Sequence, residues 1–218
     1  MNTINIGLKQ DRRALFLIGV MIIFYVVGTI GILLPLHKDF ILLTPFNLLL
    51  SLGLVLAYHQ EERSKMAWLL LGCYLWGWLV EMLGVNTGLI FGEYTYGKVL
   101  GPKILGTPLM IGVNWALLIY CAGCWTNRFF LHLHWIWKAA FTSILMVMLD
   151  LLIEPVAMQY GFWDWENSVI PIQNYIAWFF VALPLAAFFA RLFPRLTNIV
   201  ARVLFIIQIV FFFILGAV

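Results

Sequence analysis

The sequence predicts an all-α polytopic membrane protein, a bundle of about seven transmembrane helices with two partly embedded outer loops. Of 218 residues, 64% are hydrophobic and 11% are charged, whereas about a quarter of the residues in a soluble domain are charged. Seven apolar runs are each close to the ~20 residues that cross a bilayer as a helix. The hydrophilic segments between them are too short for a second domain. Residues 1–218 are therefore expected to form a single integral membrane domain.

The apolar runs and the polar breaks between them set the expected helix boundaries. The first run is about twenty residues long and lacks a small-residue cleavage site, so we expect a retained helix and not a signal peptide. The breaks contain proline, glycine or charged residues, for example Pro35, His37 and Lys38 in the first break. The helices are expected near residues 14–34, 40–58, 66–85, 105–125, 135–158, 171–190 and 197–217.

Lysine and arginine are distributed unequally between the two sides of this bundle. With the N-terminus inside, ten fall in inner segments and three in outer ones, and short cytoplasmic segments are enriched in these residues. We therefore expect a multi-pass protein of the cell (inner) membrane with a cytoplasmic N-terminus and the C-terminus outside. The inner residues are Lys9, Arg12, Arg13, Arg63, Lys65, Arg128, Lys138, Arg191, Arg195 and Arg202, and the outer ones are Lys38, Lys98 and Lys103.

Acidic and amide side chains gather in the outer half of the predicted bundle. Glu81 lies about one turn from the outer end of its helix, and Asp150 and Glu154 lie within two turns of theirs. The outer loops 84–106 and 159–170 are rich in glycine and aromatic residues. Because non-helical backbone at membrane depth must line a cavity or be buried in protein, we expect these loops to cover a cavity.

Asp150 and Glu154 are the strongest candidates for catalytic groups. Residues four apart lie on one face of a helix, and Pro155 cannot donate to the Leu151 carbonyl beside them. Carboxyl groups in a membrane span are costly and usually mark a functional site. The outer half of the helices contains no basic residue, so burial favours the protonated form, which can act as a general acid. A purely structural polar bridge is the alternative, and the sequence does not decide which of the two acids donates.

Three further residues near these acids suit the same chemistry. Glu81 is a third candidate acid, although a glutamate near a membrane surface can also extend its carboxyl group to water. Trp163 and Trp165 lie beside the acids, where their ring faces could stabilise a cation. A place in the aromatic belt at the membrane surface explains both tryptophans equally well.

Several other classes of site are disfavoured. The basic residues form no stripe, so we expect no nucleic-acid partner. The dinucleotide-binding, P-loop and HExxH motifs are absent, so we expect neither a cofactor nor a metal. The pair Cys121 and Cys124 is expected to pack in the core, and His132 and His134 to face solvent or the membrane interface. A retinal-type protein needs a Schiff-base lysine in a late helix, and residues 171–218 contain none.

An ordered set of motifs over roughly residues 76–180, about half of the chain, resembles the carotenoid 1,2-hydratase family. The motifs are EMLGVNTGLIFGEYTY at 81–96, LGP at 100–102 with GTP at 106–108, NW at 114–115, Asp150 to Pro155, and GFWDW at 161–165. The chain departs from the family pattern after Trp165, where a Gly-x-Tyr is replaced by residues 167–170, which run straight to Pro171.

The resemblance implies a cofactor-independent hydro-lyase that adds water across the terminal C1–C2 double bond of an acyclic carotenoid end group. In this interpretation Asp150 protonates C2, and Glu154 adjusts the acidity of Asp150. Glu81 orients water or stabilises the tertiary cation. The implied partners are an acyclic carotenoid in the bilayer, water and possible neighbouring enzymes of carotenoid biosynthesis. The residues implied to bind substrate or water are Asn86, Tyr94, Asn114, Trp115, Trp163, Trp165 and Asn174.

Two other functions remain open at the level of sequence. Small membrane lycopene cyclases use the same protonation and are distantly similar, but their Pro-x-Glu-Glu motif is replaced here by Pro171-Ile172-Gln173-Asn174. This difference favours the hydratase. A proton-coupled transporter would also place acids inside the membrane, but the inner half of the predicted bundle contains few polar groups to continue a proton path.

Overall fold

The computed structural model describes the backbone of residues 2–34 and 39–218 and the side chains of residues 11–34 and 39–218. Within these residues, seven helices are long and apolar enough to cross a membrane, which confirms the predicted all-α polytopic fold. Pro35, His37 and Lys38, expected in the first break, lie outside the described residues, as does the side chain of Lys9. The helices are α1 (Asn2–Leu33), α2 (Thr44–Tyr58), α3 (Arg63–Thr87), α4 (Leu109–Phe129), α5 (Trp135–Gln159), α6 (Ile172–Leu192) and α7 (Ile199–Gly216).

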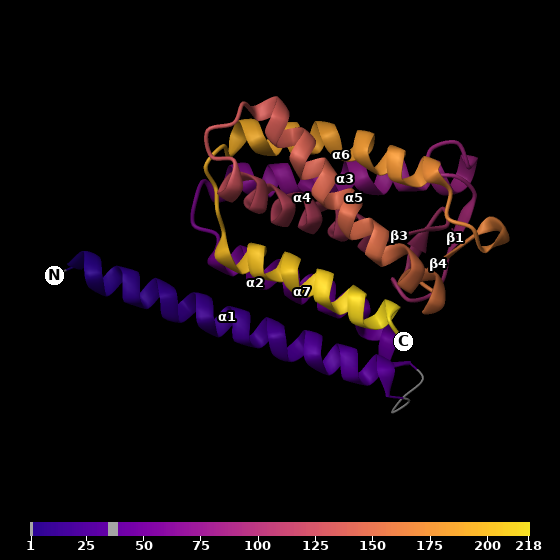
Figure 1. Ribbon diagram of the computed structural model, residues 1–218, viewed down its shortest axis with the longest axis horizontal. Helices are drawn as coiled ribbons and strands as arrows, with labels where there is room; N and C mark the ends of the chain where they lie inside the picture. The colour runs from indigo at the N-terminus through magenta and orange to yellow at the C-terminus, as the bar shows by residue number, and fades with distance from the viewer. Residues whose placement is uncertain (1, 35–38) are drawn as a thin grey trace.

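The helices form two layers, and α4 is the most central helix. Helices α3 to α6 make up one layer, and α1, α2 and α7 make up the other (Figure 1). Helix α4 contacts α2, α3, α5, α6 and α7, and 78% of its apolar stretch is buried inside the protein. Helices α1, α3, α5 and α7 end on the same side of the molecule as strands β1 and β4, where the C-terminus also lies (Figure 1). We call this side the carboxylate end.

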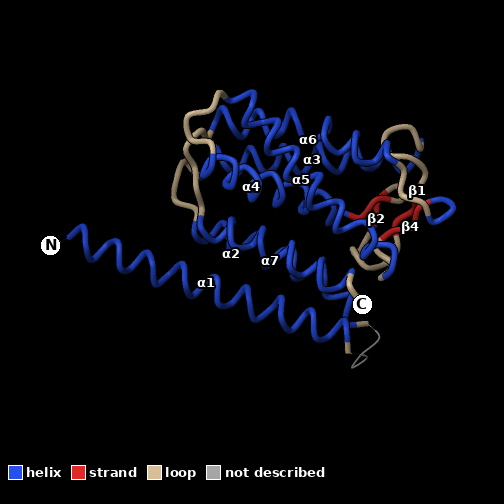
Figure 2. Tube along the Cα trace, viewed as in Figure 1, coloured by secondary structure: helices blue, strands red, loops and turns tan. Residues whose placement is uncertain are grey.

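Short strands at the carboxylate end replace the irregular loops that the sequence suggested (Figure 2). Strand β1 (Tyr94–Tyr96) pairs antiparallel with β4 (Trp163–Trp165), so that Tyr94 faces Trp165 and Tyr96 faces Trp163. The two outer loops are therefore joined to each other. A 3-10 turn, η2 (Glu166–Ser168), follows β4, and another, η1 (Phe40–Leu43), precedes α2.

Two predicted helix starts are wrong. The helix expected from residue 105 begins at Leu109, because β2 (Lys103–Ile104) and β3 (Thr107–Pro108) form a hairpin whose turn residues Leu105 and Gly106 have φ of 49° and 79°. The helix expected from residue 14 begins at Asn2, because the polar segment before it contains no proline to stop a helix. The helix expected from residue 40 starts there as a 3-10 turn and becomes α-helical at Thr44. The remaining helix ends lie within three residues of the predicted positions, except that α4 ends four residues later than expected.

Glycine allows α3 and α4 to approach closely. A Cβ atom on Gly77 would lie 2.4 Å from the Trp115 ring, so only glycine fits there. Gly84, the first residue of the expected outer loop, stays helical with the Phe91 ring against it, and Gly88 caps the end of α3 with φ of 66°. This close packing brings Glu81 and Trp115 from neighbouring helices to the same place.

Candidate active site

Three carboxyl groups are buried together at the carboxylate end. Glu81 on α3 is 3% exposed, and Asp150 and Glu154 on α5 are 0% and 2% exposed. In the described part of the chain, none of the three forms an ion pair; the ion pair present joins Lys65 to Glu62. Neutral hydrogen-bond donors surround the three groups instead.

Glu154 accepts three hydrogen bonds. Trp163 and Trp165 donate their indole N–H groups to Oε2 at 2.9 and 2.7 Å, and Asn174 Nδ2 donates to Oε1 at 2.9 Å. Residues that alternate along a strand point to the same face, so β4 directs both indoles toward α5. Asp164 between them is exposed.

Asn174, near the start of α6, connects the two acids of α5. Its Nδ2 atom also donates to Asp150 Oδ2 at 3.0 Å, so the two carboxyl groups lie on one helix face, as their spacing predicts. Asp150 Oδ1 is buried and has no hydrogen-bond partner among the described residues. Asp150 is thus the acid with one oxygen free.

Glu81 accepts three hydrogen bonds of its own. Tyr94 and Tyr96 donate to Oε2 at 2.6 and 2.7 Å, and the indole of Trp115 donates to Oε1 at 3.0 Å. Burial, followed by the nearby Glu81 charge, raises the pKa of Tyr94 and of Tyr96 well above the ordinary value for tyrosine. Both phenols therefore keep their protons and act as donors.

The donors divide the three carboxyl groups into two kinds. Hydrogen bonds donated to a carboxyl group favour its charged form, and Glu81 and Glu154 each receive three of them. Asp150 receives one and has a free oxygen that can carry a proton. The hydrogen bonds thus separate two acids whose oxygens are all engaged by neutral donors from one acid, Asp150, that keeps a free oxygen.

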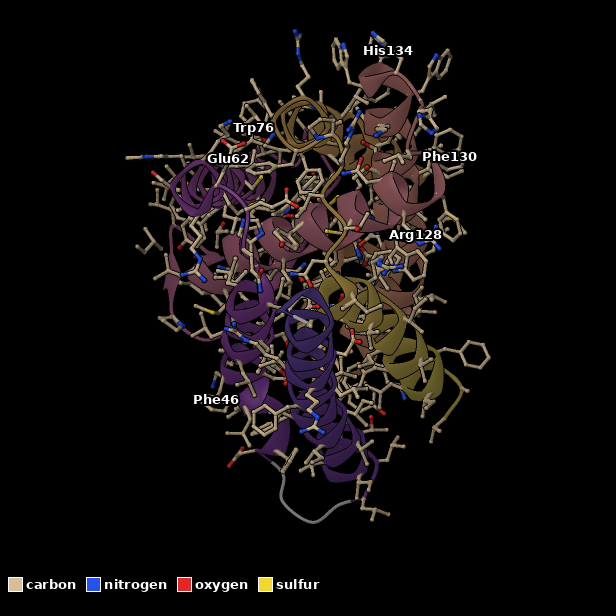
Figure 3. All side chains as sticks on the ribbon, turned by 90° about the vertical axis from the view of Figure 1, so that its left-hand side faces the viewer. Phe46, Glu62, Trp76, Arg128, Phe130 and His134 are labelled. Atoms are coloured by element: carbon tan, nitrogen blue, oxygen red, sulfur yellow. The ribbon has the colours of Figure 1, made fainter. Side chains whose placement is uncertain are left out.

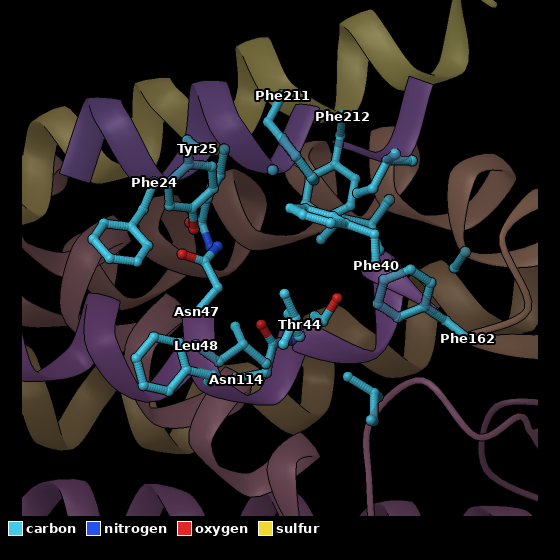
Figure 4. A pocket seen from close by; sticks show the side chains of 18 of the residues that line it. Phe24, Tyr25, Phe40, Thr44, Asn47, Leu48, Asn114, Phe162, Phe211 and Phe212 are labelled. Carbon is cyan, nitrogen blue, oxygen red and sulfur yellow. The ribbon is translucent and has the colours of Figure 1, made fainter. Parts of the chain in front are cut away.

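Two hollows lie close to these groups. The first is narrow, about 10 Å³ in volume, and is lined by Glu81, Glu154, Tyr94 and Tyr96 among others; this is roughly the space that one water molecule needs. The second is a mainly apolar cavity of about 360 Å³ between α1, α2, α4, α5 and α7 (Figure 4). The side chains of Ile111 and Trp163 line both.

The large cavity has a few polar groups among its aromatic walls. The amide side chains of Asn47 and Asn114 lie across from Phe211 and Phe212 (Figure 4). The Oδ1 atom of Asn47 is buried without a partner in the described structure. The cavity opens at the side of the protein between α1 and α2, where the lining residues Phe24 and Phe46 are exposed.

The structure brings most of the predicted site residues together, with two exceptions. Asn114 lines the large cavity and not the acid cluster. Asn86 is exposed and donates to the carbonyl groups of Met82 and Leu105, next to the β2–β3 turn. The residues that gather around the acids are Glu81, Tyr94, Trp115, Asp150, Glu154, Trp163, Trp165 and Asn174.

Two residues of the cluster are not among the site residues predicted from the sequence. Tyr96 donates to Glu81, and its position two residues after Tyr94 in a strand was a usable signal. Trp178 stacks on Trp115 with ring centroids 4.3 Å apart and lines the narrow hollow. It follows Asn174 by four residues on α6, which puts both on one helix face.

Other potential ligands lie away from this site. Among the described residues, no group of three or more His, Cys, Asp and Glu side chains is arranged to hold a metal ion. Cys121 and Cys124 are buried, unpaired thiols within α4. The donors that surround the acids come instead from tryptophan, tyrosine and asparagine.

A family model described as carotenoid biosynthesis protein matches residues 43–218. The chain belongs to the carotenoid biosynthesis protein family. It is 28% identical over 180 residues to the bisanhydrobacterioruberin hydratase of Haloarcula japonica, which covers 73% of this chain. The chain spans 59% of the length of that relative. No solved structure matches the chain.

All the carboxyl groups and donors of the site lie inside the segment that matches the carotenoid biosynthesis protein family. Helix α1 precedes that segment, yet it contributes Phe24 and Tyr25 to the large cavity. The acid cluster is thus built within the family segment, whereas one wall of the apolar cavity comes from outside it.

Proposed function

We propose that this protein is a cofactor-independent hydro-lyase that adds water across the terminal C1–C2 double bond of an acyclic carotenoid. The observation that carries the proposal is a water-sized hollow lined by the buried Glu81 and Glu154, with the buried Asp150 linked to Glu154 through Asn174 and a large apolar cavity nearby. Membership of the carotenoid biosynthesis protein family and similarity to a protein named as a hydratase support it. The end of the carotenoid enters the apolar cavity from the bilayer between α1 and α2.

Asp150 supplies the proton in the first step. It donates to C2 of the end group, and the electron pair of the double bond forms the new C–H bond, which leaves a tertiary cation at C1. Asp150 suits this role because it accepts only one hydrogen bond and has a free oxygen. A neutral acid held beside the alkene in a dry cavity gains from proximity.

Glu81 and Glu154 stabilise the cation that forms. Each is a carboxylate fixed by three donors before the reaction starts, so little reorganisation accompanies charge formation. The ring face of Trp163, which lines both hollows, adds an attraction for the cation. The donors prevent either glutamate from turning toward the cation and forming an ester with it.

Water in the narrow hollow completes the reaction. It attacks C1, and Glu154, which lines the hollow, accepts the proton that the water releases. Glu154 then returns this proton to Asp150, its neighbour one helical turn away, and the enzyme is ready for the next end group. The product is a tertiary alcohol, and the reaction consumes no cofactor.

The proposed topology places this chemistry near the outer face of the cell (inner) membrane. Ten of thirteen lysine and arginine residues fall on the side of the N-terminus, so we place that side in the cytoplasm. The C-terminus and the carboxylate end then lie on the outside. The carotenoid reaches the site within the bilayer and water reaches it from the outer surface.

A pigment assay tests the function against its alternatives. The gene is expressed in a bacterial host that makes lycopene, and the pigments are separated and their masses measured. We expect a gain of one water for each reacted end, with the polyene absorption retained. An unchanged mass with altered absorption would identify a cyclase instead, and unchanged pigments would point to a transporter or another non-enzymatic role.

A further inference from the structure

A second cavity, of about 330 Å³, lies at the opposite end of the bundle. Its walls come from α1, the end of α2 and the start of α3, and its apolar part includes Leu56 and Met66. The cationic and imidazole side chains that line it are Arg13, His59 and Arg63, and no acidic side chain of the described residues joins them. Figure 3 views the molecule from this end, with Glu62 from the same loop labelled. Basic groups without acids suggest a site for an anion.

The hydrogen bonds around His59 determine which ring nitrogen carries a proton. Asn198 Oδ1 accepts from the backbone N–H groups of Val200 and Ala201 at 2.9 and 3.2 Å, so Asn198 Nδ2 is the donor atom. This Nδ2 donates to Tyr120 Oη at 3.1 Å. The Tyr120 hydroxyl then donates its own proton to His59 Nδ1 at 2.8 Å. With Nδ1 accepting, the proton of the neutral ring is on Nε2.

The Nε2–H group of His59 is a buried donor without an acceptor. His59 is 3% exposed, and its Nε2 atom has no hydrogen-bond partner among the described residues. Burial is the main influence on the ring and lowers the pKa of His59, which favours the neutral form. Because a buried donor without an acceptor is destabilising, an acceptor in the cavity would stabilise this end of the bundle.

The two arginines offer further donors to the same cavity. Arg13 is held in place by a hydrogen bond from Nη2 to the Ala57 carbonyl at 2.6 Å, which leaves its other N–H groups free to bind a ligand. Neither Arg13 nor Arg63 forms an ion pair in the described part of the chain, where Glu62 pairs with Lys65. Glu61, the other acid of this loop, is exposed and does not line the cavity, although its backbone and its charge partly offset the effect of burial on the pKa of His59.

We propose that this cavity binds a phosphate group, presented by the headgroup of an anionic membrane lipid. Arginine matches the oxygens of a phosphate with paired donors, and the His59 Nε2–H adds a third, directed donor. Basic pockets between transmembrane helices at the cytoplasmic surface are suited to anionic headgroups. Leu56 and Met66 provide apolar surface for the start of the acyl chains. A phosphate compound from solution has the same oxygen chemistry, and the test separates the two sources.

Lipid binding to the purified full-length protein in neutral detergent tests the proposal. Native mass spectrometry would compare phosphatidylglycerol with phosphatidylcholine, which carries a phosphate but no net charge. We expect at least tenfold tighter binding of phosphatidylglycerol, and loss of that preference in the double variant Arg13→Gln, Arg63→Gln. The matched control for the single variant Arg13→Gln, which should itself weaken the preference, is Arg12→Gln, which removes one positive charge from the neighbouring residue of α1 but none from the cavity lining. Equal binding of the two lipids, or an equal loss with Arg12→Gln, would overturn the proposal.

A second arm identifies the source of the phosphate and the role of His59. Inorganic phosphate that stabilises the wild type against heat as strongly as the lipid does, through the same arginines, would assign the site to a soluble phosphate compound. His59→Gln keeps an N–H donor at the place of Nε2 and should retain the lipid preference, whereas His59→Leu should weaken it several-fold. Equal behaviour of these two variants would remove His59 from the site. The cavity shares no lining residue with the acid cluster, so these results are independent of the proposed hydration.

Discussion

At the residue scale, the three carboxyl groups differ in the donors that surround them. Glu81 and Glu154 each accept three hydrogen bonds from tryptophan, tyrosine or asparagine, whereas Asp150 accepts one. None of these donors carries a charge, so they stabilise a carboxylate without forming an ion pair. This difference is the basis for assigning the proton to Asp150.

Replacement of Asp150 by asparagine should remove the proton donor with little change in shape. The introduced amide side chain would still present an oxygen to Asn174 Nδ2, so the protein should remain folded in the membrane. We expect turnover to fall by roughly 10²–10⁴-fold, the usual contribution of a general acid, in the pigment assay. Asp164→Asn is the matched control, because Asp164 is exposed on β4 between the two site tryptophans. Retained turnover in the Asp150 variant would exclude it as the donor and leave Glu154.

Replacement of Tyr96 by phenylalanine removes one of the three donors to Glu81. A hydrogen bond to a charged group contributes roughly 1.5–3 kcal/mol, and each 1.4 kcal/mol of transition-state stabilisation changes the rate about tenfold. We therefore expect turnover to fall about ten- to hundredfold at unchanged protein levels. Tyr160→Phe, at the same end but outside the cluster, should change little. Equal turnover in the Tyr96 variant and the wild type would show that Glu81 does not stabilise the cation.

At the element scale, the pairing of β1 with β4 assembles the site. It brings donors for Glu81 from one loop next to donors for Glu154 from the other, as the facing pairs Tyr94–Trp165 and Tyr96–Trp163 show. Hydropathy located the transmembrane helices, and the four-residue spacing placed the two acids of α5 on one face. The strands are only three residues long, so their alternation is too brief a signal to predict that the two loops pair.

The contact between α3 and α4 gives a prediction at the same scale. Gly77→Ala would place a Cβ atom 2.4 Å from the Trp115 ring and force the two helices apart. We expect a loss of about 1–3 kcal/mol in stability, measured as thermal unfolding in detergent, together with reduced turnover because Trp115 holds Glu81. In Gly72→Ala, on the same helix, the new Cβ atom would meet nothing within 4 Å. If the two variants proved equally stable, close packing at Gly77 would not be what positions Glu81.

At the scale of the whole molecule, the proposed reaction uses the apolar cavity and the acid cluster together. The walls of the cavity come from α1, α2, α4, α5 and α7, and Ile111 and Trp163 line both the cavity and the narrow hollow. The sequence predicted that polar groups gather in one half of the bundle. This gathering alone predicted a site near one membrane surface. The sequence also predicted that the two loops cover a cavity but not which helices enclose it, because those helices are far apart in the chain and their contacts depend on tertiary packing.

The most direct measurement of the central claim is isotope incorporation by the purified protein acting on an acyclic carotenoid. In deuterium oxide that contains heavy-oxygen water, each reacted end should gain one deuterium at C2 and one heavy oxygen at C1, located by fragment masses. Asp150→Asn should yield neither label. Oxygen incorporation without deuterium at C2, or deuterium at C2 in a product that gains no oxygen, would contradict protonation at C2 followed by water capture at C1.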